Sequence, residues 1–397
     1  MWISSFLISG SLTMVMPFLS LLIDTMGDYS TEYVLKWAGL VFGVTFVTAF
    51  LISPVWGRVG DRHGRKKLLM ILSFGASICV LLMGIVTSVH HLFIVRLFMG
   101  FFAGFIPMAQ AFIATQTPKK IAGKVMGTLQ TGQVSGGLFG PLFGGWLADS
   151  FGFTYTFLLT GFIILFTFFM IWVGVKEVEV NKSHSKKEDY SSKQVFHFIF
   201  TSPLLLVVMV VGMLVQIANF SIQPLLAIYV GELHGQQNLA FFSGAAFSVV
   251  GLGSLLLSRE WGKLGDRYGH ERVLLVLVLV GAIVYMPQAF VTSIWQLLIL
   301  RLFLGMVIGG VIPCIVAYIR QAAPFSIQGE VLGYNTSFRF FGNVVGPVMG
   351  GFISGYIGIS SVFFVTSGLF IIGGLLIWAV RSKSKFPQDK VKEHSLQ

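Results

Sequence analysis

Apolar stretches of about 20 residues follow one another along almost the whole chain of 397 residues. Each stretch is long enough to cross a hydrocarbon layer of about 30 Å as an α-helix. A backbone in lipid must satisfy its own hydrogen bonds, which favours helices over open sheets. We therefore predict an all-α membrane protein with twelve transmembrane helices. The predicted spans are Trp2–Ile23, Leu35–Trp56, Leu68–Val86, Leu92–Thr115, Val125–Ala148, Tyr155–Val175, Pro203–Tyr229, Leu239–Leu257, Val273–Phe290, Leu297–Ile319, Val331–Ile353 and Ser361–Val380.

The chain is also an internal duplication. The run Gly57–Lys67 returns as Gly262–Arg272, at an offset of 262 − 57 = 205. Two further blocks recur in register: Arg96–Gly100 as Arg301–Gly305, and Gly136–Gly145 as Gly342–Gly351. An even number of spans in each copy makes the two copies parallel repeats, as in rocker-type transporters.

This duplication divides the chain into four parts. We predict a six-helix half over residues 1–175, a polar linker over 176–202, a second six-helix half over 203–380 and a tail over 381–397. Met1 opens directly into the first span, so we expect a few residues to be missing before it.

Basic residues are distributed very unevenly. Of the 27 Lys and Arg residues, 23 lie after the even-numbered spans, which predicts that these segments and both termini are cytoplasmic. We expect the plasma membrane of a bacterium. Topology explains the net charge of +11 without a nucleic-acid partner, while the lipid bilayer is an obligatory one.

Motifs for chemistry are lacking in this sequence. Cys79 and Cys314 are single thiols inside spans 3 and 10, so neither a disulfide framework nor a metal-ligand spacing exists. The sequence offers no nucleophile-base pair or phosphate loop. We expect no cofactor and no metal, and an enzyme is the least favoured class.

The repeated blocks resemble the signature motifs of the major facilitator superfamily. The first hairpin is similar to its motif between spans 2 and 3, and Arg96 with Gly100 to its span 4 motif. Gly136-x-x-x-Gly140-Pro141 resembles the motif of exporters in the drug:proton antiporter group. The resemblance implies the major facilitator fold and favours efflux. Shorter blocks, Val15–Leu19, Ser337–Arg339 and Gly342–Pro347, are similar to a bacterial multidrug efflux branch of that group.

The first hairpin has two interpretations. A carboxylate is favoured at a helix N-terminus by about 0.3 to 1 kcal/mol, and the resemblance implies that Asp61 caps span 11 near Gly329–Val331 and closes the cytoplasmic side. The alternative is a solvated basic turn that only sets topology. The residues of this predicted latch are Gly57, Asp61, Arg62, Gly64, Arg65 and Asp266.

Small residues in spans 5 and 11 predict close helix contacts. Gly136 and Gly140 are four residues apart on one face, and Pro141 removes one backbone hydrogen bond. Gly346 and Pro347 repeat the last two positions. These residues either only pack the helices or also flex as the halves rock.

A polar stripe in span 11 is the strongest indication of a substrate cavity. Asn335, Arg339 and Asn343 are four residues apart, and Arg339 lies too deep to reach the membrane surface easily. The alternative is an interhelical hydrogen-bond cluster that packs the bundle. Further polar side chains on other predicted spans complete the candidate cavity: Gln110, Gln133, Gln216, Asn219 and Gln223.

A proton-coupling group is hard to identify, since no Asp, Glu or His lies well inside any span. Asp24, at the outer end of span 1, is the nearest acid, although an ordinary loop acid is the simpler explanation. Arg96 and Arg301 lie near the outer ends of their spans, where we expect long side chains to reach the interface. The resemblance links Arg96 to proton coupling, so we retain Asp24, Arg96 and Arg301 as candidates.

The predicted function is secondary active export of small amphipathic or anionic compounds by a monomer. Export would proceed by alternating access and be driven by inward proton flow. The alternatives are a permease for one metabolite, such as a sugar or organic anion, and a receptor or scaffold that transports nothing.

Overall fold

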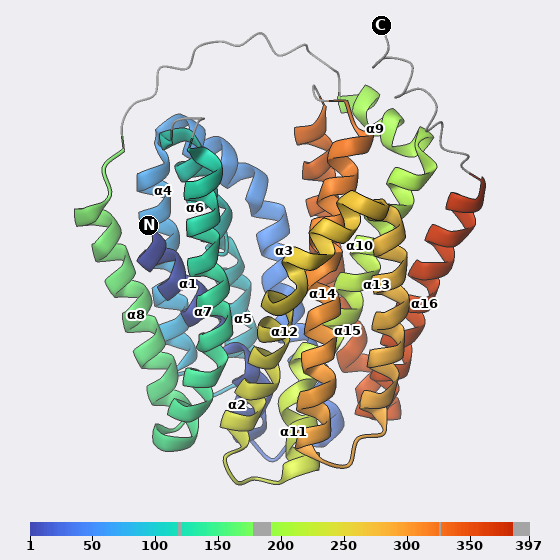
Figure 1. The fold of residues 1–397 in the computed structure, drawn as a ribbon. Helices are drawn as coiled ribbons and strands as arrows, with labels where there is room; N and C mark the ends of the chain where they lie inside the picture. The colour runs from blue at the N-terminus through green and yellow to red at the C-terminus, as the bar shows by residue number, and fades with distance from the viewer. Residues whose placement is uncertain (118–120, 178–191, 325–326, 384–397) are drawn as a thin grey trace, which may run out of the picture.

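A computed structural model describes residues 1–117, 121–177, 192–324 and 327–383, which form a bundle of long helices in two halves (Figure 1). The first half contains α1 Trp2–Met14, η1 Met16–Phe18, α2 Leu19–Thr25, α3 Thr31–His63, α4 Arg65–Met83, α5 Val89–Phe101, α6 Phe105–Gln116, α7 Ala122–Phe151 and α8 Phe153–Gly174. The second contains α9 Ser192–Thr201, α10 Pro203–Ile222, η2 Gln223–Leu225, α11 Leu226–His234, α12 Leu239–Tyr268, α13 His270–Tyr285, η3 Met286–Ala289, α14 Ile294–Ala322, α15 Gln328–Ile357 and α16 Ile359–Lys383.

The predicted all-α membrane class is confirmed. Within the described residues, 11 helical segments are long and apolar enough to cross a membrane. The predicted fifth span, Val125–Ala148, lies within α7, which is helical throughout but rich in glycine and polar residues. The helix therefore exists, but it is not among the 11 that qualify by composition.

Each charged repeat forms a tight hairpin whose two sides are helical. Helix α3 continues to His63 and α4 begins at Arg65, so a single glycine, Gly64, makes the turn. The second copy turns in the same way at Gly269. Both glycines have positive φ angles, 93° and 94°, which L side chains rarely adopt. The helices therefore extend past the predicted spans, which ended at Trp56 and began again at Leu68.

Part of the predicted linker is also helical. Residues 178–191 lie outside the described residues, but α9 follows them. Val195 and Ile199 of α9 are buried in the hydrophobic cluster of the second half, and Phe196 packs against Tyr334 of α15. The end of the linker is therefore attached to the second half.

The duplication extends to individual hydrogen bonds. Trp56 Nε1 donates to the carbonyl of Phe101, and Trp261 Nε1 donates to that of Met306. Both partners are displaced by 205 positions (261 − 56 and 306 − 101). The two halves thus share a scheme of packing as well as a pattern of sequence.

Within each half, one helix lies against its neighbour through a glycine stripe. A Cβ at Gly136 or Gly140 of α7 would collide with the carbonyl of Phe6 or Gly10 in α1. Gly342 and Gly346 of α15 face α10 in the same way. Helix α7 remains continuous through Pro141, and α15 through Pro347. Small residues therefore let these backbones touch, as in other lipid-embedded helix pairs.

We expect Gly136→Val to lower the free energy of unfolding by about 1 to 3 kcal/mol, because overpacking must push α7 away from α1. Thermal unfolding of the purified protein measures the change. Gly368→Val in α16 is the matched control, because a Cβ there meets no atom of the described residues within 4 Å. Equal melting temperatures for the two variants would contradict the close approach.

Candidate functional site

The two halves meet at two seams, which we define as the contacts between α7 and α12 and between α3 and α15. In the first seam, a Cβ at Gly145 would collide with the carbonyl of Ala240, and one at Gly244 with that of Pro141. In the second seam, Gly39 lies against the carbonyl of Pro347. A Cβ at Gly351 would lie 2.7 Å from the carbonyl oxygen of Leu35. Both seams are thus backbone contacts made possible by glycine.

Each seam helix carries a second glycine 18 residues away, five turns along the same face and about 27 Å distant. These are Gly57, Gly127, Gly262 and Gly333, and a Cβ at any of them would meet none of the described atoms within 4 Å. The seams are therefore closed at one end and open at the other. We call the open end, where α3 meets α4, the basic end, and the opposite one the far end. Figure 1 shows the halves apart at the basic end and together at the far end.

The polar stripe of α15 lies between these ends. Asn335 is 2% exposed and Arg339 is half-buried, eleven residues into the helix. Both lie beside Gly212 of α10, whose added Cβ would be 3.8 Å from Asn335 Oδ1 and 4.0 Å from Arg339 Cγ. In the described part of the chain, neither Asn335 Oδ1 nor Arg339 Nε has a hydrogen-bond partner. Such unsatisfied buried groups are expensive unless a ligand or water meets them.

Other predicted cavity residues form two separate pairs. Gln216 Nε2 of α10 donates to Asn343 Oδ1 of α15 over 2.9 Å. Gln110 Nε2 of α6 donates to Gln133 Oε1 of α7 over 3.1 Å. The Gln216–Asn343 pair matches the packing interpretation, because it ties α10 to α15 inside one half.

One amide keeps unused hydrogen-bonding capacity. Gln133 Nε2 is buried, and across the described residues it finds no partner. Gln133 and Arg339 occupy equivalent places in the repeat, since 339 − 133 = 206. The two halves therefore each place an unpartnered donor at the same level of the bundle. Asn219 and Gln223 are half-buried, and the hydrogen bonds described for this polar set do not include them.

The expectation that Arg96 and Arg301 reach the membrane interface is wrong. Their exposed fractions are 1% and 4%. Arg96 Nε donates to the carbonyl of Val41 over 3.4 Å, and Arg301 Nε to that of Ala246 over 2.7 Å. Position along a helix did not reveal that both face a neighbouring helix in their own half. Asp24, the third proton-coupling candidate, is exposed.

The predicted latch is only partly described. The side chain of Asp61 lies outside the described residues, and Arg62 is exposed. A Cβ at Gly329, in the first turn of α15, would meet none of the described atoms within 4 Å. Asp266 lies 3.3 Å from His270 Nε2 within its own half.

Sequence reasoning missed Glu177, which lies just after α8. Its carboxylate accepts hydrogen bonds from the backbone N–H groups of Arg65 and Lys66, over 2.8 and 3.0 Å. The Arg65 guanidinium donates to the carbonyl of Ala111. These contacts hold the first hairpin to α6 and α8 of its own half. An acid at the start of a polar linker offered no sequence signal for this role.

These features define a class: a duplicated, multi-helix membrane protein with buried polar groups in mid-bundle and with two halves that are closed together at one end. Comparison with known proteins supports that class and gives the family. The model of the Major Facilitator Superfamily matches residues 1–259 and 224–396. The chain belongs to that superfamily.

Relatives agree over nearly the full length. An uncharacterized MFS-type transporter, YuxJ of Bacillus subtilis (strain 168), is 54% identical over 385 residues, covering 97% of this chain and 98% of that protein. The multidrug resistance protein MdtG of Serratia proteamaculans (strain 568) is 38% identical over 395 residues, covering 99% and 96%. The predicted likeness to a bacterial multidrug efflux branch is therefore confirmed.

Solved structures show the same fold. A bacterial homolog to the human lysosomal transporter Spinster, in an inward-facing and occupied conformation, superimposes with a TM-score of 0.80 at 16% identity, covering 96% of this chain and 95% of that one. A D-xylose-proton symporter gives a TM-score of 0.75 at 14% identity, covering 95% of both chains.

We expect the Gln216–Asn343 hydrogen bond to couple α10 to α15 by about 0.6 kcal/mol, the average for such bonds in a membrane protein. A double-mutant cycle with Gln216→Leu and Asn343→Leu, followed by unfolding in mixed micelles, measures that coupling. A cycle that pairs Gln216→Leu with Thr336→Val provides the uncoupled comparison. Additive effects at Gln216 and Asn343 would show that the bond contributes nothing.

Proposed function

We propose that this chain exports small amphipathic or anionic compounds from a bacterial cell in exchange for protons. The observation that carries the proposal is the Nε of Arg339, which has no hydrogen-bond partner among the described residues and lies half-buried beside Asn335 and Gly212 within the bundle. A cationic group at that place favours substrates with an anionic or strongly accepting group. The similarity to MdtG, a multidrug resistance protein, supports export over uptake.

The mechanism in this proposal is alternating access. With both termini in the cytoplasm, the open basic end faces inward, so a substrate enters the centre from the cytosol or the inner leaflet. The basic end would then close and the far end would open, which releases the substrate on the opposite side of the membrane. Residues 1–175 and 203–380 would move as the two bodies, and the linker would allow their motion.

Proteoliposomes with an imposed pH gradient test the function directly. We expect export of anionic dyes and drugs to rise with inward proton flow and to stop when a protonophore dissipates the gradient. Transport that ignores the gradient would require another driving force. Uptake of one metabolite alone would replace multidrug export with the permease alternative.

We expect Arg339→Gln to weaken binding of anionic substrates by about 10- to 100-fold, which corresponds to losing one hydrogen bond to a charged group. Arg339→Lys keeps the charge and should retain part of the affinity. Arg272→Gln removes an exposed arginine at the basic end and serves as the control. Equal substrate affinity in Arg339→Gln and Arg272→Gln would make the α15 stripe a packing feature.

We expect Asp61→Asn to slow export at equal expression, because the amide cannot supply the negative charge that favours the N-terminus of α15 when the basic end closes. Asp266→Asn is the comparator, since Asp266 pairs with His270 in its own half. Whole-cell dye efflux measures both variants. Unchanged efflux in Asp61→Asn would reduce the first hairpin to a topological signal.

A further inference from the structure

At the far end, a carboxylate of one half caps a helix of the other. Asp149 in the last turn of α7 accepts from Ala240 N–H through Oδ1 over 3.1 Å and from Phe241 N–H through Oδ2 over 2.7 Å. Ala240 and Phe241 belong to the first turn of α12. These are direct hydrogen bonds between the two halves, and they lie at the outer edge of the α7–α12 seam.

Helix α12 has no cap of its own at this end. The side chain of Asn238, its N-cap residue, makes no capping hydrogen bond, and the first turn contains no acid. The first N–H groups of a helix have no partner inside the helix, so an outside acceptor must meet them. Asp149 supplies both oxygens.

The position of Asp149 is electrostatically unfavourable for its own helix, α7. An acid in the last turn faces the negative end of its own helix dipole, which is unfavourable. The same carboxylate is favourable at the N-terminus of α12. Stability of α7 therefore does not explain this residue, whereas contact with the other half does.

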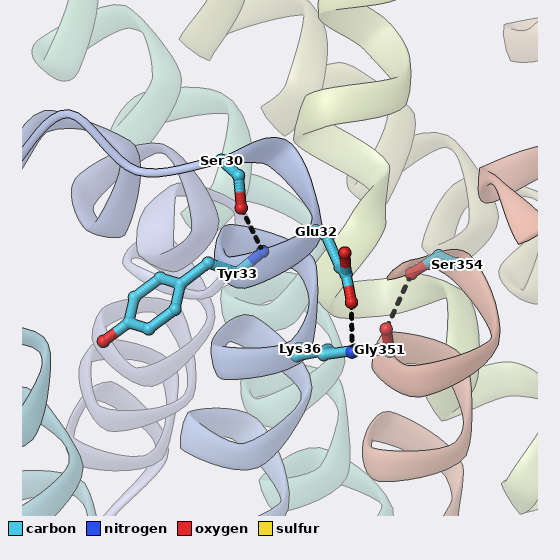
Figure 2. A network of polar contacts seen from close by, with 6 residues as sticks. All are labelled: Ser30, Glu32, Tyr33, Lys36, Gly351 and Ser354. Atoms are coloured by element: carbon cyan, nitrogen blue, oxygen red, sulfur yellow. Dashed lines mark hydrogen bonds and ion pairs between the residues drawn. The ribbon is translucent and has the colours of Figure 1, made fainter. Parts of the chain in front are cut away.

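The α3–α15 seam has a counterpart with the opposite charge. Gly355 is the repeat equivalent of Asp149 (355 − 149 = 206), and Lys36 of α3 lies across it. Lys36 Nζ lies 3.6 Å from the ring centroid of Tyr356, in a last turn of α15 that contains no base. Figure 2 shows Lys36 reaching from α3 towards the turn of α15 that holds Gly351 and Ser354, while also bonded to Glu32 of its own helix. A cation suits a helix C-terminus.

The geometry points to Asp149 as a conformational lock: its carboxylate holds the far end closed and must release Ala240 and Phe241 each time that end opens. Lys36 makes a weaker contact across its seam than Asp149 does, because it also forms an ion pair with Glu32 of its own helix. The lock acts at the opposite end from the latch expected of Asp61. It rests on the proposed alternating access but adds a residue to it.

Distance measurements between spin labels test the lock in the full chain, reconstituted into proteoliposomes on which a pH gradient can be imposed. Cys79 and Cys314 are first replaced by alanine. Tyr155→Cys and Trp295→Cys, both exposed near the far end and on different halves, then carry the labels. His63→Cys with Arg267→Cys, both exposed, reports the basic end in a parallel sample.

We expect Asp149→Ala to raise the ratio of long to short far-end distances by about tenfold or more, given two lost charge-assisted hydrogen bonds. Asp149→Asn retains one acceptor oxygen and should fall between this variant and the wild type. Asp28→Ala removes an exposed acid at the same end and should leave the ratio unchanged. An unchanged ratio in a folded Asp149→Ala protein overturns the lock, and should that variant fail to fold, an unchanged ratio in Asp149→Asn does so.

The far-end distances of the wild type distinguish a failure of the lock from a failure of the proposed function. If its far end lengthens under an inward proton gradient but the Asp149 variants leave the ratio as it was, only the lock fails. A far end that stays short in every condition, with no transport, overturns both.

Discussion

The helix bundle depends on direct contacts between the backbones of neighbouring helices at glycine. Helix α7 packs against α1 on one face through Gly136 and Gly140, and against α12 on another through Gly145. Helix α15 repeats this arrangement against α10 and α3. Lipid provides little hydrophobic driving force between helices, so close van der Waals contact at small residues must hold such a bundle together. One contact face of each helix lies inside a half and the other between halves. A rocking motion can therefore keep the first and release the second.

The buried polar groups differ in where their hydrogen-bond partners lie. In the middle, the Gln216–Asn343 bond is satisfied within one half, while Arg339 Nε and Gln133 Nε2 stay unpartnered in the part of the protein that the structure describes. At the far end, Asp149 bonds across the seam. The satisfied pair stiffens its half. In the proposed function, the unpartnered donors are available to a ligand, and the cross-seam bonds are made in one state and broken in another.

Apolar length and internal repeats predicted the fold well, because both can be recognised in the sequence without knowing which side chains meet. The helices at the charged repeats were predicted too short, since charge marks the edge of the membrane and not the end of a helix such as α3. Arg96 and Arg301 were placed at the interface because depth along a helix says nothing about which neighbour a side chain faces. Glu177 and Asp149 act on backbone atoms more than 90 residues away, and only the tertiary structure brings these partners together.

Differences between the halves are informative because the shared packing is so regular. Pro17 and Pro224 are 207 positions apart, Trp56 and Trp261 are 205 apart, and the glycines of α7 and α15 are 206 apart. The offset thus changes between helices while the contacts persist, so insertions were tolerated in the connections and not in the seams. Two pairs of equivalent positions nevertheless differ between the halves: Gln133 corresponds to Arg339, and Asp149 corresponds to Gly355. Packing does not require these differences. One of these differences lies among the buried polar groups and the other at the edge of a seam. Under the proposed alternating access, they would act on substrate binding and on the balance between states.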